Sequence, residues 1–133
     1  MGYAHISIKG AISMADNKNQ LREDSITFAL SVSDICDEIK GCPVYVNQLI
    51  RSSSSVGANL HEAKYAQSRA DFISKLEIAL KESSETEYWL ELLYRKNKLS
   101  TEQYTCLKNQ CGGIRRRLIA SITTAKGNNS KRV

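Results

Sequence analysis

Proline, histidine and long apolar runs are scarce in this chain, and each shortage excludes a class of structure or chemistry. Pro43 is the only proline in 133 residues, and it lies between two segments with helical patterning. No apolar run approaches the roughly 18 residues that a membrane-spanning helix needs. The N-terminus lacks a basic segment followed by an apolar block, so no secretory signal is expected. The sequence therefore predicts a cytoplasmic protein with no membrane segment.

Only two histidines, His5 and His61, are available as metal ligands or catalytic bases. Di-iron sites in helical bundles need Glu-x-x-His on two helices, and Ala58 stands where that glutamate would precede His61. Tyr65 replaces the second histidine that a His-Glu-x-x-His zinc site requires. The glycines match no phosphate-binding loop. We therefore expect no catalytic residue, no metal and no cofactor, and we expect that the protein is not an enzyme.

The cysteines also argue against a metal site. Cys36, Cys42, Cys106 and Cys111 contain no C-x-x-C pair, and their spacings do not suit a zinc knuckle. Free Cys commonly packs as a small apolar side chain, so we expect reduced thiols.

Positive charge is concentrated at the C-terminal end of the chain. From Lys96 onward there are nine Lys or Arg residues and one acid, Glu102, a formal charge of +8. Residues 1–60 carry a formal charge of −1 and residues 61–95 carry −2, so the whole chain has +5. This uneven distribution favours contact with phosphate groups near the C-terminus.

Apolar residues recur at steps of three and four, the period of an α-helix. A first helix is predicted from about Asn19 to Lys40, before Gly41 and Pro43. Its predicted core face is Ile26, Ala29, Leu30, Ser33 and Cys36 or Asp37. A second helix is predicted over residues 44–66, with a core face of Leu49, Ser53, Val56, Leu60 and Ala63. Its run of four serines would suit a linker, because serine is a mediocre helix former, but the periodicity continues through it and favours a helix.

Ser68 and Asp71 resemble a capping box that begins a third helix. Its core stripe is predicted as Phe72, Leu76, Ala79, Ser83, Thr86, Leu90 and Leu93. A second apolar stripe on the same helix consists of Ile78, Trp89 and Leu92. A helix with two apolar faces in a chain of this size favours self-association.

Ser100 and Gln103 form a capping box for a fourth helix. Its predicted core positions are Tyr104, Leu107, Cys111, Ile114, Leu118 and Ile122. Glycine is unfavourable inside a helix, so the pair Gly112 and Gly113 predicts a kink or a local break.

The four helices and their short connections predict an all-α fold, a single-domain antiparallel up-down four-helix bundle. We assign the bundle to residues 19–126. Residues 1–18 lack a helical period and are expected to form a flexible N-terminal arm, with either Met1 or Met14 as the natural start. Residues 127–133 are expected to form a disordered basic tail.

The basic residues of the fourth helix are the candidate nucleic-acid-binding set: Lys108, Arg115, Arg116, Arg117 and Lys126. Three consecutive arginines span about 200° of a helix surface, so they cannot all face the core. No aromatic platform is expected beside these residues, which favours recognition of backbone and shape. The charge can instead serve solubility, or it can contact an acidic protein.

A second candidate set lies on the second and third helices: Arg51, Asn59, Glu62 and Glu82. Asn59 and Glu62 are three residues apart and therefore neighbours on a helix surface. Glu82, Glu85 and Glu87 offer carboxylate partners for Arg51 or Lys81. We interpret the set as a polar network that fixes helix register or a subunit contact. A solvated face and a ligand site are the alternatives.

Several sequence runs resemble the family of 23S rRNA intervening-sequence proteins: RSSSSVGANLHEA, AQS, DFISKLEIALKE and ETEYWLELL. The resemblance covers about residues 28–126 and is strongest over residues 48–93. It implies a left-handed up-down four-helix bundle, commonly assembled as a homopentamer, without enzymatic activity. The run Cys111-Gly112-Gly113 departs from the family pattern, in which good helix formers stand at these positions.

The same resemblance suggests two biological settings. Some members of the family lie in open reading frames within 23S rRNA genes, and a related branch assists reverse transcriptases of diversity-generating retroelements. We predict a non-catalytic oligomeric adaptor that binds RNA or another nucleic acid through the basic last helix. The alternative is a protein–protein scaffold, such as a reverse-transcriptase accessory. The expected partners are further copies of the chain, RNA or DNA, and a reverse transcriptase or other protein, with no membrane.

Overall fold

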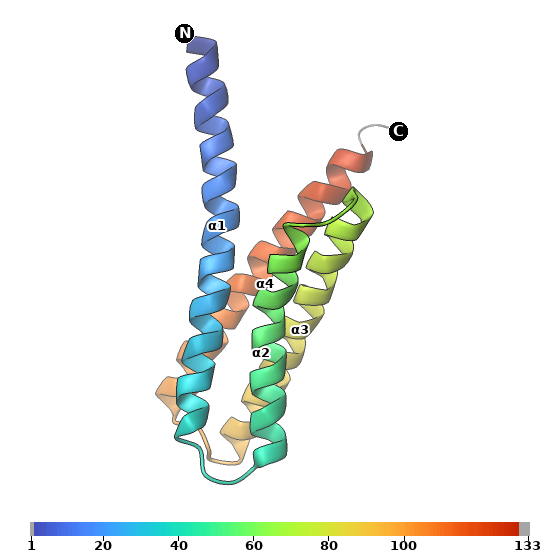
Figure 1. The fold of residues 1–133 in the computed structure, drawn as a ribbon. Helices are drawn as coiled ribbons and strands as arrows, with labels where there is room; N and C mark the ends of the chain where they lie inside the picture. The colour runs from blue at the N-terminus through green and yellow to red at the C-terminus, as the bar shows by residue number, and fades with distance from the viewer. Residues whose placement is uncertain (1, 131–133) are drawn as a thin grey trace.

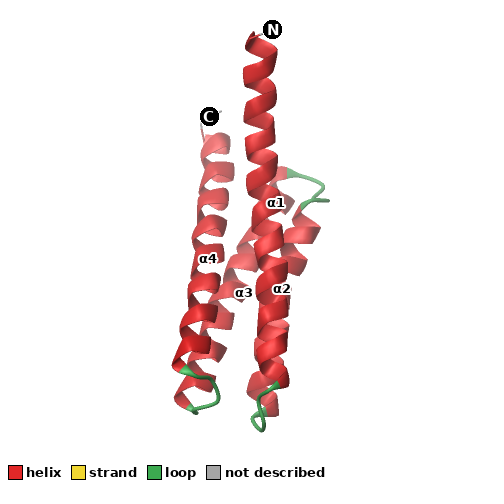
Figure 2. Cartoon of the chain, turned by 90° about the vertical axis from the view of Figure 1, so that its left-hand side faces the viewer, coloured by secondary structure: helices red, strands yellow, loops and turns green. Residues whose placement is uncertain are grey.

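Four antiparallel helices form the protein, as a computed structural model shows for residues 2–130, with side chains described for residues 19–127. They are α1 (Gly2–Asp37), α2 (Pro43–Ala63), α3 (Arg69–Arg95) and α4 (Thr101–Ser130). The α1–α2 and α3–α4 turns lie at one end, and the α2–α3 turn lies at the other (Figures 1 and 2). Each helix packs against two others in the cyclic order α1, α2, α3, α4. The predicted all-α up-down bundle is confirmed.

The helix ends follow from local side-chain and backbone hydrogen bonds. At the start of α4, Ser100 and Gln103 cap each other, because the Gln103 N–H donates to Ser100 Oγ at 3.0 Å and the Ser100 N–H donates to Gln103 Oε1 at 2.9 Å. At the start of α3, Ser68 Oγ accepts from the Asp71 N–H at 3.0 Å. The Asp71 carboxylate accepts from the Gln67 N–H, one residue before the position that a capping box uses. Both predicted starts are confirmed.

A left-handed residue ends α3. Asn97 has a φ of 61°, a conformation that Asn tolerates better than most residues. This turn lets the Lys98 N–H donate to the Leu93 carbonyl at 2.9 Å, which satisfies a carbonyl that the helix leaves unpaired. The chain then enters α4 after a short connection, which keeps α3 and α4 antiparallel.

One hydrophobic core runs along the bundle, and the stripes predicted for α2, α3 and α4 are confirmed. Leu49 and Val56 are buried on α2, Leu76 and Leu90 on α3, and Leu118 on α4. The remaining predicted positions are also buried, or pack half-buried against the core: Ser53, Leu60, Ala63, Phe72, Ala79, Ser83, Thr86, Leu93, Tyr104, Leu107, Cys111, Ile114 and Ile122. Regular apolar spacing over a long segment therefore identified the buried face of these helices.

The face predicted for α1 is wrong in most of its positions. Ile26 and Leu30 are 38% and 60% exposed, and the buried row is Leu21, Ser25, Phe28, Val32 and Cys36. Two apolar rows run side by side on this helix. The row with Phe28 faces inward because it buries the largest apolar side chain. It also places the small Ser25 next to Gly57 of α2, where an added Cβ would lie 3.6 Å from Ser25 Cβ.

Small polar residues fill the interface between α2 and α3. Ser52 and Thr86 are fully buried, and their hydroxyl oxygens lie 3.0 Å apart. Ser52 Oγ is also 3.4 Å from the Leu49 carbonyl, and Thr86 Oγ1 is 2.8 Å from the Glu82 carbonyl. Each buried hydroxyl can therefore donate to a carbonyl of its own helix. The serine run is a helix segment that lets α2 approach α3 closely.

Both ends of the chain are more helical than predicted. The first helix was predicted to begin at about Asn19, whereas α1 begins at Gly2 and continues past the ends of the other helices (Figure 1). Extending an existing helix adds a hydrogen bond per residue without a new nucleation cost, so no apolar stripe is required. Helix α4 likewise continues through residues 127–130 of the predicted tail. Residues 1 and 131–133 lie outside the described residues, and the flexibility of both ends stays a prediction.

Helix α4 is not broken at the glycine pair. It runs without interruption from Thr101 to Ser130, through Gly112 and Gly113. The helical preference lost at two glycines is about 1 kcal/mol each. The neighbouring residues Cys111 and Ile114 are both 1% exposed, so core packing fixes the turns on either side. Tertiary contacts therefore outweigh the local preference.

Candidate nucleic-acid interface

The basic residues of α4 point in different directions. Arg115 Nε lies 3.1 Å from Glu87 Oε1 of α3, and Lys126 Nζ lies 3.6 Å from Glu77 Oε1 of the same helix. Arg117 points toward α1, where its Nη2 donates to Asp24 at 2.6 Å. Three of the five predicted phosphate-binding residues therefore contact a carboxylate within the chain: Arg115, Arg117 and Lys126.

The Asp24–Arg117 pair ties α4 to α1 at their small interface. The hydrogen bond from Arg117, followed by one from Gln20, lowers the pKa of the Asp24 carboxyl below 3.8. The side chains of Arg117 and Asp24 are 42% and 38% exposed, so solvent screens their attraction. The pair orients the guanidinium more than it stabilises the fold.

Arg116 differs from its neighbours because it makes no ion pair or hydrogen bond within the described residues. It is exposed, and its guanidinium lies over the backbone of Gly112 and Gly113. A Cβ added at Gly112 would lie 3.3 Å from Arg116 Nη1, and one at Gly113 would lie 3.9 Å from Arg116 Nη2. The four-residue spacing of Gly112 and Arg116 is the sequence signal for this contact, because such residues are neighbours on a helix.

Lys108 is also exposed and has no carboxylate partner among the described residues. Its Nζ lies 5.5 Å from the centroid of the Tyr104 ring. Tyr104 stacks on Tyr94 of α3, with centroids 4.2 Å apart and planes at 2°. An aromatic ring therefore accompanies Lys108, but it is stacked on Tyr94, and the absence of an aromatic platform for bases stays a prediction. Such a contact holds the ammonium by attraction to the ring face.

The polar set on α2 and α3 divides into separate contacts. Arg51 pairs with Glu82 at 3.3 Å and with Glu85 at 2.6 Å. The hydrogen bond from Arg51 lowers the pKa of the Glu85 carboxyl. Glu62 instead pairs with Lys75 at 3.0 Å, and Asn59 Nδ2 donates to the Ser55 carbonyl at 2.8 Å. Arg51, Asn59, Glu62 and Glu82 thus form no single network within one chain, and a subunit contact stays a prediction.

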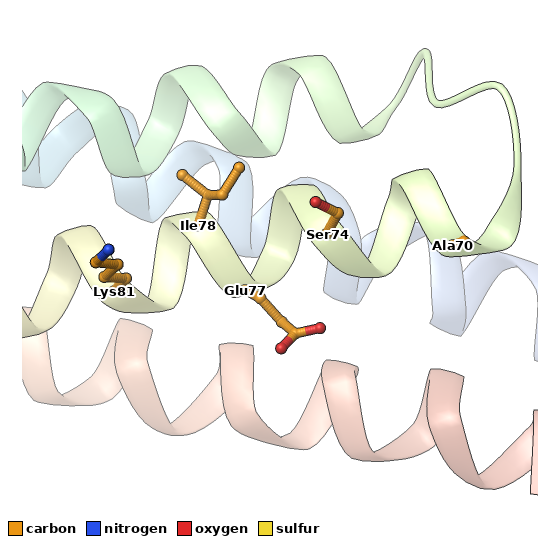
Figure 3. Close-up of a pocket in the computed structure, with 5 residues that line it drawn as sticks. All are labelled: Ala70, Ser74, Glu77, Ile78 and Lys81. Atoms are coloured by element: carbon orange, nitrogen blue, oxygen red, sulfur yellow. The ribbon is translucent and has the colours of Figure 1, made fainter.

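The second apolar stripe of α3 is partly covered by α2. Trp89 is half-buried, stacks on Tyr45 of α2 with ring centroids 5.9 Å apart, and donates to Glu85 at 3.3 Å. Leu92 is also half-buried, whereas Ile78 is 39% exposed. Ile78 points toward α2 and lines a shallow depression with four other α3 residues, Ala70, Ser74, Glu77 and Lys81 (Figure 3). The stripe contributes one exposed apolar side chain to the outer surface.

The described residues contain no group of three His, Cys, Asp or Glu side chains placed to hold a metal ion. All four cysteines are free thiols. Burial raises the pKa of Cys36 to about 11 and that of Cys111 to about 12, so both stay protonated near neutral pH. Over the same part of the chain, no helix has the length and hydropathy to cross a membrane.

These features define an antiparallel four-helix-bundle protein with a basic last helix. The sequence profile of the 23S rRNA-intervening sequence proteins matches residues 17–120, and the chain belongs to this family. The chain is also similar to a crystal structure of a protein of unknown function from the S23 ribosomal protein family of Bacteroides thetaiotaomicron VPI-5482. The TM-score is 0.75 and the identity 41%, over 80% of this chain and 98% of that chain. No curated protein shows significant sequence similarity.

Proposed function

We propose that this protein is a non-catalytic, oligomeric adaptor that binds RNA through α4. The proposal rests on two exposed basic residues, Arg116 and Lys108, which have no carboxylate partner among residues 19–127 and lie on the most basic part of the chain. A cation that is already neutralised gains little from a phosphate, whereas an unpaired one gains a charge-assisted contact. The family name is consistent with an RNA setting.

Arg115 and Arg117 extend the proposed surface on either side of Arg116. Their side chains remain 38% and 42% exposed beside their carboxylate partners. Fixed side chains lose less conformational freedom on binding, which favours affinity. These groups present charge and hydrogen-bond donors in a set geometry, without a pocket for a base. We therefore expect recognition of the phosphate backbone and of RNA shape.

We further propose that copies of the chain associate, with the pentamer of the family as the expected state. The exposed apolar side chains Ile26 and Leu30 on α1 and Ile78 on α3 support this proposal, because burying them would remove apolar surface from water. A closed ring would repeat α4 around its axis and multiply weak phosphate contacts. We place this function in the cytoplasm.

A protein–protein scaffold is the second candidate function. It is favoured by the same exposed residues of α1, because the Ile26 and Leu30 row can accept a helix of another protein, such as a reverse transcriptase. In that case the charge of α4 would serve solubility, and RNA would bind weakly or not at all.

Binding of a structured RNA at about 50 mM salt tests the proposal. The double variant Lys108→Ala/Arg116→Ala removes two basic groups of α4 that have no carboxylate partner in the described part of the chain. A matched variant, Lys64→Ala/Arg69→Ala, removes one lysine and one arginine that are exposed around the α2–α3 turn. We expect the first variant to weaken binding by about tenfold or more, and the second to change it little. Equal effects of the two variants, or no binding by the natural chain, would contradict an RNA role for α4.

A further inference from the structure

The guanidinium groups of Arg115 and Arg116 converge above one glycine. A Cβ added at Gly112 would lie 3.3 Å from Arg116 Nη1 and 3.9 Å from Arg115 Nη2, and no other heavy atom of a different turn or helix lies within 4 Å of it. Gly112 is nevertheless buried, because these side chains cover it. Helical side chains lean toward the N-terminus, which brings the charged ends of both arginines over this turn.

This arrangement leaves N–H donors unused. Arg116 makes no hydrogen bond within the described residues. Arg115 Nε is near Glu87 at 3.1 Å, but the contact lacks hydrogen-bond alignment and the buried Nε–H has no acceptor. Glu87 is the one carboxylate that contacts either guanidinium in the described part of the chain, so the pair keeps an excess positive charge. An oxyanion would supply the acceptors that the exposed Arg116 guanidinium lacks and the negative charge that the pair lacks.

We propose that Arg115 and Arg116 bind a single phosphate group of an RNA backbone between them, with Gly112 as the floor of the site. The RNA part of this inference rests on the proposed function. A methyl group at position 112 would lie 3.3 Å from Arg116 Nη1, so the guanidinium would have to shift by a few tenths of an ångström. Gly112 thus has a role in positioning Arg116.

The adjacent glycine provides a matched control. A Cβ at Gly113 meets Arg116 Nη2 at an ordinary contact distance of 3.9 Å and meets no other heavy atom within 4 Å. Gly112→Ala and Gly113→Ala therefore bring the same gain in helix propensity. They differ in whether the guanidinium must move. Arg116→Lys tests whether the guanidinium group is needed, because lysine keeps the positive charge and lacks the planar pair of N–H donors.

The direct test is a titration of the full chain with inorganic phosphate, followed through the NMR signals of the arginine Nε–H groups at constant ionic strength. We expect the signals of Arg115 and Arg116 to shift together and to saturate, while Arg95 at the end of α3 does not respond. Gly112→Ala should weaken phosphate binding by about threefold or more, since it strains a charge-assisted contact, and Gly113→Ala should leave it unchanged. Parallel, unsaturated shifts of all exposed arginines, or equal effects of the two alanine variants, would overturn the site.

The same four proteins, the natural chain and the variants Gly112→Ala, Gly113→Ala and Arg116→Lys, are then tested with structured RNA. Loss of RNA affinity in Gly112→Ala and Arg116→Lys, but not in Gly113→Ala, would support the phosphate site as part of the RNA surface. Saturable phosphate binding without RNA binding would leave the site standing and refute the RNA function. RNA binding that none of these substitutions changes would refute the site and leave the RNA function standing.

Discussion

Replacing Ser52 by leucine tests whether the serine run is a tightly packed helix segment. Ser52 is fully buried between α2 and α3, with Thr86 Oγ1 3.0 Å from its hydroxyl oxygen. A leucine side chain cannot fit there unless the two helices separate. Thr86 keeps a hydrogen bond in this variant, because its hydroxyl can still donate to the Glu82 carbonyl at 2.8 Å. Overpacking therefore dominates, and we expect a loss of about 1–3 kcal/mol in the free energy of unfolding.

Ser54 provides the control on the same helix. It is exposed, and its hydroxyl also donates to a helix carbonyl, that of Ile50, at 2.8 Å. Ser54→Leu should change the free energy of unfolding by no more than about 0.5 kcal/mol. For a chain of this size, about 3–5 °C in Tm corresponds to each kcal/mol, so Ser52→Leu should unfold about 3–15 °C earlier.

Thermal unfolding followed by circular dichroism measures both variants. Two protein concentrations are needed, because association makes Tm depend on concentration. Equal unfolding temperatures for Ser52→Leu and Ser54→Leu would show that Ser52 is not packed between helices, and they would refute the close approach of α2 and α3.

Three further predictions concern single groups. The carboxyl pKa of Asp24, measured by NMR, should rise toward its ordinary value in Arg117→Ala. In the natural chain the ion pair stabilises the fold at pH values above the ordinary carboxyl pKa. This stabilisation is lost as the pH falls through the lowered pKa of Asp24. Unchanged titration would exclude the ion pair. Iodoacetamide at pH 8 should alkylate the exposed Cys106. The buried Cys111, whose pKa is raised to about 12, should react only after unfolding. Peptide mass spectrometry measures the alkylation of each cysteine. Asn97→Ala should lower the free energy of unfolding, measured with urea, by about 1 kcal/mol. The φ of 61° at this position is strained for most residues that carry a Cβ, and Asn tolerates it better. An unchanged free energy of unfolding would contradict the left-handed turn.

Long periodic segments made most of the core predictable from sequence. On α3, apolar or small positions at helical spacing identified six of the seven buried residues, all except Ile73, and the capping residue Ser68 identified the start of the helix. On α1 the spacing led to the wrong row, because Ile26 and Leu30 form a second apolar row beside the row with Phe28. Periodicity shows that a helix has an apolar row, and it cannot decide which of two rows meets the other helices.

The candidate interface was predictable in its composition but not in its pairing. The sequence identifies α4 as basic, and Glu82, Glu85 and Glu87 as candidate carboxylate partners of Arg51 or Lys81, because charge and spacing are visible in it. Which arginine stays unpaired depends on the acids of other helices, since Glu87 approaches Arg115 and Asp24 approaches Arg117. Those contacts depend on how each helix is rotated about its axis and shifted along it relative to its neighbours. The sequence pattern of a single helix does not determine either quantity.

The salt dependence of RNA binding tests the central claim most directly. Each phosphate contact should add about 0.7–0.9 to the slope of log affinity against log salt concentration. Measured between about 50 and 200 mM salt, the natural chain should bind a structured RNA with a steep negative slope, and Lys108→Ala/Arg116→Ala should reduce that slope by about 1–2 for each chain in contact with the RNA. A slope near zero for the natural chain, or the same slope for both proteins, would contradict phosphate binding by α4.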